Sequence, residues 1–168
     1  MNNLKPTRMA RHVTEIDLAW LNERGVRAVL ADVDNTVVGW HSEDVPEEII
    51  LWVEGILGEG IGFCLVSNTR NPKRLERLAA RFGVKFVPGN AGKPGAAGYL
   101  KALELLGASA SEAVMVGDQL FTDVYGANKL GIATVLVNPL TPKEFIGTKV
   151  VSRTLEKLIL RGENARPT

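Results

Sequence analysis

The chain has 168 residues, of which 45% are hydrophobic and 23% are charged, and its formal net charge at pH 7 is +1. This length predicts a single folded domain over residues 1–168, and the near-neutral charge gives no reason to expect a nucleic-acid partner. No apolar run approaches about 18 residues, so we expect no membrane-spanning helix, and the first twelve residues lack the apolar core of a secretory signal.

The N-terminal part predicts an extended arm followed by a helix. Residues 1–13 carry several basic side chains and few apolar ones, so we expect an arm that is extended over this range. Thr14 has the character of a helix N-cap, and Gly25 that of a residue following a helix C-terminus. Further along, the single cysteine, Cys64, lies in an apolar run, which predicts a buried thiol in a protein of the reducing cytoplasm.

Short apolar segments then alternate with amphipathic ones. The apolar segments predict strands at 26–32, 61–67, 84–87, 113–116 and 133–137. The amphipathic segments predict helices at 45–57, 72–81, 93–106 and 120–130. Beyond them we expect a helical turn at 141–144, an edge strand at 149–151 and a last helix at 154–160.

This alternation predicts an α/β fold. Segment 61–67 shows little polar alternation, which is typical of a strand buried on both faces in a parallel sheet. Five main strands with intervening helices indicate a three-layer, doubly wound parallel sheet. Active sites of such folds lie at the carboxyl ends of the strands, so the functional residues should directly follow strands.

Two carboxylates, Asp32 and Asp34, come at the end of the first main strand in the phrase D-V-D-N-T. Aspartate is rare in strands and neighbouring carboxylates repel each other, so a cation is expected between them. Mg²⁺ is the natural candidate because it prefers hard oxygen ligands. The alternative is a turn in which the side chains only bond the local backbone.

Further polar residues follow the later strands at the same predicted edge. Ser67 and Asn68 follow the second strand, Lys93 follows the third, and Asp118 and Asp123 follow the fourth. Scattered surface charges would not all fall at one edge of a sheet. Their order after successive strands therefore favours a site over separate turns.

These motifs resemble a known superfamily. D-V-D-N-T, S-N, K-P and G-D-Q-L-F-T-D, in this order, are similar to the motifs of the haloacid dehalogenase (HAD) phosphohydrolases. The N-terminal L-K-P and the phrase V-G-D-Q-L-F-T-D-V-Y-G-A-N-K-L-G resemble the subfamily IIIA phosphatases of the YqeG family over about the first 140 residues. A mitochondrial phosphatidylglycerophosphate phosphatase is similar over the same phrases. The resemblance implies an HAD-like Rossmannoid core.

The resemblance also implies roles for the acidic residues. Asp32 would be the nucleophile that forms an aspartyl phosphate. Asp34 would be the general acid and then the general base, with its backbone carbonyl on Mg²⁺. Asp118 would give the metal a carboxylate, and Asp123 would be a further ligand or would anchor the ligands. Transport ATPases of this superfamily have threonine where Asp34 stands, which favours hydrolysis.

The remaining motif residues would bind the phosphoryl group. Ser67 would donate its hydroxyl to a phosphoryl oxygen, with Asn68 beside it, and Lys93 would offset the charge of the nucleophile and the phosphate. Arg70 would either be solvated or meet a second anionic group of the substrate. Trp40 would either pack against the loop or border the substrate pocket.

The spacing between the motifs leaves no room for a cap domain, either between Asp34 and Ser67 or between Asn68 and Lys93. An open site suits a bulky substrate, such as a phosphoprotein, a nucleic-acid end or a phospholipid headgroup at a membrane surface. Self-association into a homo-oligomer would be another way to cover it.

Our hypothesis is a cytoplasmic Mg²⁺-dependent phosphomonoesterase with phosphatidylglycerophosphate as a candidate substrate, acting peripherally at the membrane. The alternative is a binding module that uses the same fold to dock a ribosome, a nucleotide or a protein partner.

Overall fold

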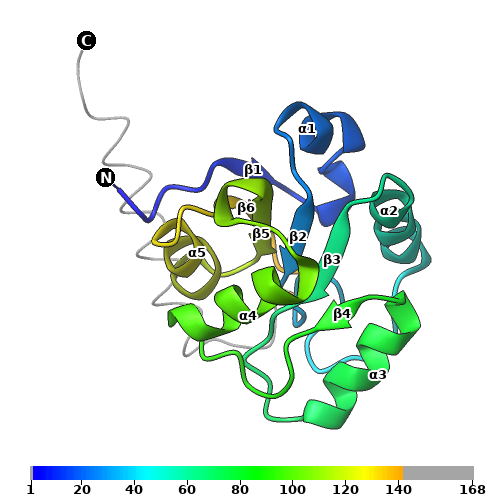
Figure 1. Cartoon of the computed structure of the whole chain (residues 1–168). Helices are drawn as coiled ribbons and strands as arrows, with labels where there is room; N and C mark the ends of the chain where they lie inside the picture. Colours follow the sequence, from blue (N-terminus) through cyan, green and yellow to red (C-terminus); the bar gives the residue numbers. More distant parts are fainter. Residues whose placement is uncertain (1, 142–168) are drawn as a thin grey trace.

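The computed structural model describes residues 2–141, and its strands form one six-stranded parallel sheet. The strand order is β1-β6-β5-β2-β3-β4 (Figure 1). The strands are β1 (Arg8–Ala10), β2 (Ala28–Ala31), β3 (Gly62–Leu65), β4 (Lys85–Phe86), β5 (Ala113–Gly117) and β6 (Ala133–Val137). The predicted doubly wound parallel sheet is confirmed, with one strand more than the five main strands expected.

Helices of three kinds connect the strands. The α-helices are α1 (Leu18–Glu23), α2 (Glu47–Gly58), α3 (Pro72–Phe82), α4 (Ala96–Leu106) and α5 (Gly126–Asn128). Two short 3₁₀ helices, η1 (Val13–Glu15) and η2 (Ala110–Glu112), and the π-helical η3 (Leu120–Tyr125) complete the set in the described residues. One helix and one strand lie between Asp34 and Ser67, and again between Asn68 and Lys93, so the described chain carries no cap at either place.

Strand β2 lies at the centre of the sheet, between β3 and β5. In the register, Leu30 faces Cys64 on one side and Met115 on the other. All four residues of β2 are buried, which explains why its sequence is apolar throughout rather than alternating.

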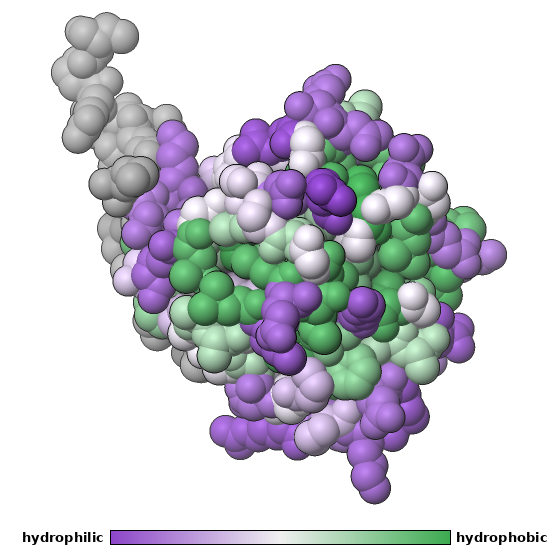
Figure 2. Space-filling view, viewed as in Figure 1, coloured by the Kyte–Doolittle hydropathy of each residue, from purple (hydrophilic) through white to green (hydrophobic). Residues whose placement is uncertain are grey.

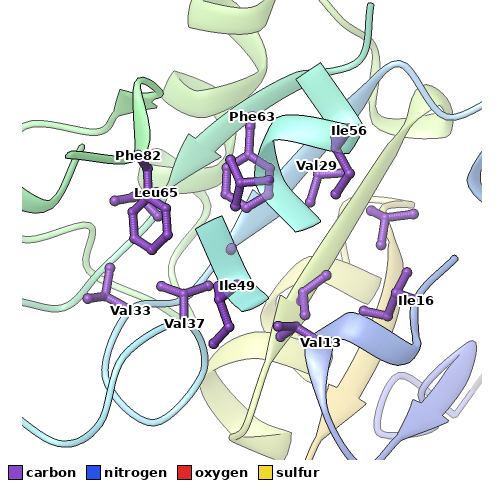
Figure 3. Packing of buried hydrophobic residues seen from close by; sticks show 14 of the residues in the cluster. Val13, Ile16, Val29, Val33, Val37, Ile49, Ile56, Phe63, Leu65 and Phe82 are labelled. Carbon is purple, nitrogen blue, oxygen red and sulfur yellow. The ribbon is translucent and has the colours of Figure 1, made fainter. Parts of the chain in front are cut away.

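The two faces of the sheet pack against different helices. Val29 and Phe63 lie in a cluster with Ile49 and Ile56 of α2, and residues of α3 complete it (Figure 3). On the opposite face, Leu30 packs in a second cluster with residues of α4 and α5. Successive residues of β2 thus point to opposite layers, as a three-layer fold requires.

Exposed apolar side chains are spread over several elements. Figure 2 shows hydrophobic residues across the middle of one face, with hydrophilic residues above and below them. Met9, Leu51, Leu100 and Phe121 are each more than half exposed, and they come from β1, α2, α4 and η3. None of the helices in residues 2–141 is both long and apolar enough to cross a lipid bilayer.

The N-terminal arm joins the sheet as its edge strand. Arg8 pairs in register with Val135 of β6. Thr7 and Thr134 exchange hydrogen bonds, since each backbone N–H donates to the other's hydroxyl at 3.3 and 3.0 Å. The Asn128 amide also donates to the backbone carbonyls of Asn3 and Lys5, at 2.9 Å each. The sequence predicted an extended arm. Hydrogen bonds to residues far along the same chain make part of this arm a strand.

The predicted helix cap at Thr14 is wrong. Residues Val13–Glu15 form a 3₁₀ turn, and the ring of His12 accepts a hydrogen bond from the Thr14 N–H. The α-helix begins later, where the Asp17 carboxylate accepts from the Trp20 N–H at 2.7 Å. An aspartate three residues further along thus takes the cap, because the chain first turns to bury Val13 in the core.

The helix predicted over 120–130 is divided. Its first part is the π-helical η3, in which the Val124 N–H reaches back to the Gln119 carbonyl at 3.4 Å, and α5 follows. Such wide turns are often found at functional sites. The elements expected beyond residue 141 lie outside the described residues.

The buried thiol of Cys64 gives a first test of the packing. Burial raises the pKa of Cys64 to about 12, and the side chain lies fully inside the core. Since the thiolate is the reactive form, we expect a disulfide reagent at pH 8 to label native protein at least about 100-fold more slowly than protein unfolded in guanidinium. Absorbance of the released thiol measures both rates, and fast stoichiometric labelling of native protein would contradict this packing.

Candidate active site

Strand topology brings the first group of predicted site residues together. Asp32 directly follows β2, Ser67 comes two residues after β3, and Asp118 follows β5. The Asp32 N–H donates to the Val116 carbonyl at 2.9 Å, which continues the β2–β5 ladder up to the acid. Because β2 lies between β3 and β5, these three residues lie at the same carboxyl edge of the sheet, and all three are buried.

Three carboxylates converge at this edge. Asp32, Asp118 and Asp123 each offer an oxygen, these oxygens lie within 4.8 Å of one another, and all three residues are buried. Asp123 comes from η3, where its Oδ2 accepts from the Gln119 N–H at 3.1 Å. Buried carboxylates this close need positive charge between them. Hard oxygen donors in this number fit a divalent cation such as Mg²⁺.

Lys93 supplies positive charge beside the same carboxylates. Its Nζ donates to Asp32 Oδ1 at 3.0 Å and to Asp123 Oδ1 at 2.7 Å, and its side chain is 2% exposed. Burial disfavours the ammonium, but the carboxylates of Asp123 and Asp32 outweigh burial and raise the pKa of Lys93 above its usual value. Burial also raises the pKa of Asp123 to about 6, against the opposing effect of Lys93. Lys93 therefore remains charged at neutral pH.

Asn68 holds the backbone of Lys93 in place. Its Nδ2 donates to the Lys93 carbonyl and its Oδ1 accepts from the Lys93 N–H, each at 2.8 Å. The Lys93–Pro94 peptide that follows is cis. Both ends of the Asn68 amide are thus used on Lys93, whereas the sequence predicted Asn68 as a phosphate-binding residue beside Ser67. That binding role stays a prediction.

The carboxylate of Asp34 lies outside the three-acid cluster. Arg74 donates to both of its oxygens, at 2.9 and 3.2 Å, and the His41 N–H donates to Oδ1 at 2.8 Å. The sequence predicted Asp34 as a metal residue through its backbone carbonyl, and the side chain found here leaves that prediction open. Arg74 was not predicted, while Arg70, which was considered, is exposed.

Asn35 fixes the loop that carries Asp32 and Asp34, which we call the acid pair. Its backbone has a positive φ of 63°, which asparagine tolerates better than most residues. Its Oδ1 accepts from the Thr141 N–H at 3.0 Å and from the Thr141 hydroxyl, and its carbonyl accepts from the Leu140 N–H at 3.2 Å. The Trp40 N–H also donates to the Thr141 hydroxyl, at 3.2 Å. The loop after β2 is thus tied to the chain beyond β6.

Gly117, which precedes Asp118, leaves room for Asp123. A Cβ at this position would overlap the Asp123 carboxylate. We therefore expect Gly117→Ala to displace that carboxylate and to lower the phosphate release expected from the motifs by at least about tenfold, since small misplacements of reacting groups are costly. The matched control is Gly58→Ala, because a Cβ at Gly58 meets no atom within 4 Å. Assays of phosphate release, with melting curves for folding, would contradict the prediction if Gly117→Ala kept full activity.

Comparisons with known proteins show the family to which the chain belongs. A family model described as HAD-hydrolase-like matches residues 90–139, which include Lys93, Asp118 and Asp123. A protein of Bacillus subtilis described as probable phosphatase YqeG is 31% identical over 155 residues, covering 92% of this chain and 88% of that protein. The chain belongs to the YqeG family. The predicted family and the enzyme class, an HAD-type phosphatase, are thereby confirmed.

Two further proteins are similar to this YqeG-family chain. A phosphatidylglycerophosphate phosphatase of Arabidopsis thaliana is 29% identical over 163 residues, with 87% of this chain and 44% of that protein covered. The crystal structure of an HAD phosphatase from Thermococcus onnurineus matches with a TM-score of 0.52 and 30% identity, covering 61% of this chain and 51% of that one. The fold is thus shared with an HAD phosphatase of known structure.

Proposed function

We propose that the protein is a Mg²⁺-dependent phosphomonoesterase that acts through an aspartyl phosphate on Asp32. The observation that carries this proposal is the convergence of three buried carboxylates with the Lys93 ammonium at the carboxyl edge of the sheet. Carboxylates are costly to bury without a function or a partner. The family supports the choice of phosphoryl transfer.

The metal would be held by side chains that the fold has already brought together. Asp32 and Asp118 would be ligands, with the backbone carbonyl of Asp34, and Asp123 would be either a ligand or an anchor of Lys93 and the ligands. When bound, Mg²⁺ would neutralise charge on the nucleophile and on the phosphoryl oxygens. The donors are all hard oxygens, which fits this ion.

The side chains divide the reaction into two displacements. Asp32 attacks phosphorus and forms the aspartyl phosphate, while the P–O bond to the leaving group breaks and Asp34 gives that oxygen a proton. Asp34 then takes a proton from the water that attacks phosphorus, the P–O bond to Asp32 breaks, and inorganic phosphate leaves with the Asp32 carboxylate restored. The Ser67 hydroxyl donates to a phosphoryl oxygen. Lys93 holds Asp32 in place and offsets negative charge.

The substrate is proposed to be a bulky phosphomonoester. The described chain has no cap over the site, so a large alcohol moiety can remain outside it. Similarity to a phosphatidylglycerophosphate phosphatase supports a lipid phosphate, presented at a membrane surface, as that substrate. Association of two copies, which would shield the site, stays a prediction.

The test is phosphate release from a panel comprising 4-nitrophenyl phosphate, a phosphopeptide and phosphatidylglycerophosphate in mixed micelles. We expect turnover that is lost with EDTA and restored by Mg²⁺, with the highest kcat/KM for the lipid. Equal kcat/KM values for all three esters would reject the lipid as preferred substrate. An absence of turnover, together with stoichiometric capture of a partner, would favour the binding-module alternative.

A further inference from the structure

Arg74 of α3 is buried against the loop that carries the acid pair. Its guanidinium makes a two-pronged ion pair with Asp34, with 8% of the arginine side chain and 19% of the aspartate side chain exposed. The same guanidinium donates to the Ser42 carbonyl from Nε at 3.2 Å and from a terminal nitrogen at 2.6 Å. One side chain thus ties α3 to both ends of the loop from Asp34 to Ser42.

The two-pronged contact fixes the direction in which the Asp34 carboxylate points. Two parallel N–H···O bonds define the plane of the carboxylate, which a single bond would leave free to rotate. The His41 N–H adds a third donor to Oδ1 at 2.8 Å. The remaining freedom of the loop is small, since Ser42 is bonded to the same guanidinium. The orientation of the side chain proposed to transfer the proton is therefore fixed by its contact with α3.

Arg77, one turn further along α3, offers a contrast. It also contacts an acid of the neighbouring loop by two bonds, to Glu43 at 2.6 and 3.1 Å. These two side chains are 56% and 46% exposed, however, and Glu43 is no part of the site. Both arginines join the same helix to the same loop, so Arg77 serves as a control for a purely structural tie.

We propose that Arg74 is a positioning residue that orients Asp34 for proton transfer to the leaving group; this inference rests on the proposed phosphatase function. Proton transfer requires the acid to lie within hydrogen-bond reach of the leaving oxygen. Misplacement by about 1 Å can cost 100-fold in rate. A lysine cannot replace the two-pronged contact, because its ammonium is a point charge.

The experiment compares two esters of nearly equal size, phenyl phosphate and 4-nitrophenyl phosphate. Phenolate is a basic leaving group, so its departure is assisted by proton transfer to the leaving oxygen. 4-Nitrophenolate is much less basic and departs with little such assistance. The quantity kcat/KM covers the steps up to ester cleavage, so the ratio of the two values reports on acid assistance. With Mg²⁺ present, we expect Arg74→Gln to lower the phenyl to nitrophenyl ratio about tenfold or more, and Asp34→Asn to do the same.

Further variants separate orientation from folding. The double variant Asp34→Asn, Arg74→Gln should lower the ratio no further than Asp34→Asn alone, since both changes remove the same contribution. Arg77→Gln should leave the ratio unchanged. Arg74→Lys keeps the charge and should still lower the ratio, which provides a reading if Arg74→Gln melts too early to assay.

Two results would overturn the inference, and they are distinguishable. Turnover that depends on Asp32, with both esters slowed equally by Arg74→Gln and by Arg74→Lys, would give Arg74 a purely structural role and leave the phosphatase proposal standing. No turnover of either ester by wild-type protein with Mg²⁺ would overturn both proposals together.

Discussion

Asp32→Asn is expected to lower the rate of Mg²⁺-dependent phosphate release by at least about 1,000-fold, because it removes the proposed nucleophile. The amide has nearly the same shape as the carboxylate but does not attack phosphorus. Lys93 keeps its contact with Asp123 in this variant, so the fold should persist. The rate is measured with 4-nitrophenyl phosphate, and acid quenching with mass spectrometry looks for a phosphorylated peptide containing residue 32 in the wild type alone.

The control for this variant is Asp44→Asn, an exposed aspartate beyond the loop that carries the acid pair. It makes the same chemical change on the surface, and we expect wild-type turnover. Melting curves of both variants show whether a loss of rate comes from unfolding. Equal rates for wild type and Asp32→Asn would remove Asp32 as the nucleophile, whatever metal the protein binds.

The positions of Asp32 and Asp118 could be predicted because they follow directly from the strand topology. Asp32 and Asp118 directly follow two strands that pair side by side, and Ser67 lies beyond the strand on the other flank. Parallel strands end at one edge, so residues after them must approach each other. Apolar runs followed by acids are visible in a single sequence, and this prediction needs no knowledge of side-chain contacts.

The residues that orient the site could not be predicted in the same way. Arg74 lies 40 positions from Asp34, and Thr141 lies 106 positions from Asn35. In the sequence, Arg74 is one of several basic residues of α3, and nothing distinguishes it from Arg77. What distinguishes them is burial, which depends on how α3 packs on the loop. This difference in burial is set by tertiary packing and leaves no pattern in the local sequence.

The pairing of the edge strand β1 could not be predicted from the sequence either, because it too depends on tertiary structure. Its sequence, Arg-Met-Ala, shows no alternation of polar and apolar residues, and the mutual hydrogen bonds of Thr7 and Thr134 hold it to β6. A polar arm can become a strand when a neighbouring strand offers an unpaired edge. The sequence predicted its extended form but not its partner, since the partner lies more than a hundred residues away.

Lys93→Met is expected to lower the free energy of unfolding by about 3–5 kcal/mol in EDTA, because it leaves two buried carboxylates without their shared cation. Burial raises the pKa of Asp123 to about 6 even with Lys93 beside it, and without Lys93 it should rise further. The folded-state value then exceeds the unfolded value of about 3.9, so the folded protein binds more protons. The stability of the variant should therefore fall as pH increases through that folded-state pKa.

Urea unfolding of Lys93→Met at pH 5 and pH 8 measures this dependence, and Lys101→Met is the control. Lys101 pairs with Glu104 at the surface, at 3.3 Å, and such pairs contribute little to stability.

Mg²⁺ should restore part of the lost stability at pH 8, because an ion that binds only the folded carboxylates shifts the equilibrium toward the folded state. Wild-type stability of Lys93→Met in EDTA at pH 8 would mean that the carboxylates do not depend on Lys93. Restoration by Mg²⁺ but not by Na⁺ would instead place the divalent ion among the same oxygens that Lys93 contacts. The ammonium and the metal would then be two cations stabilising one cluster of acids.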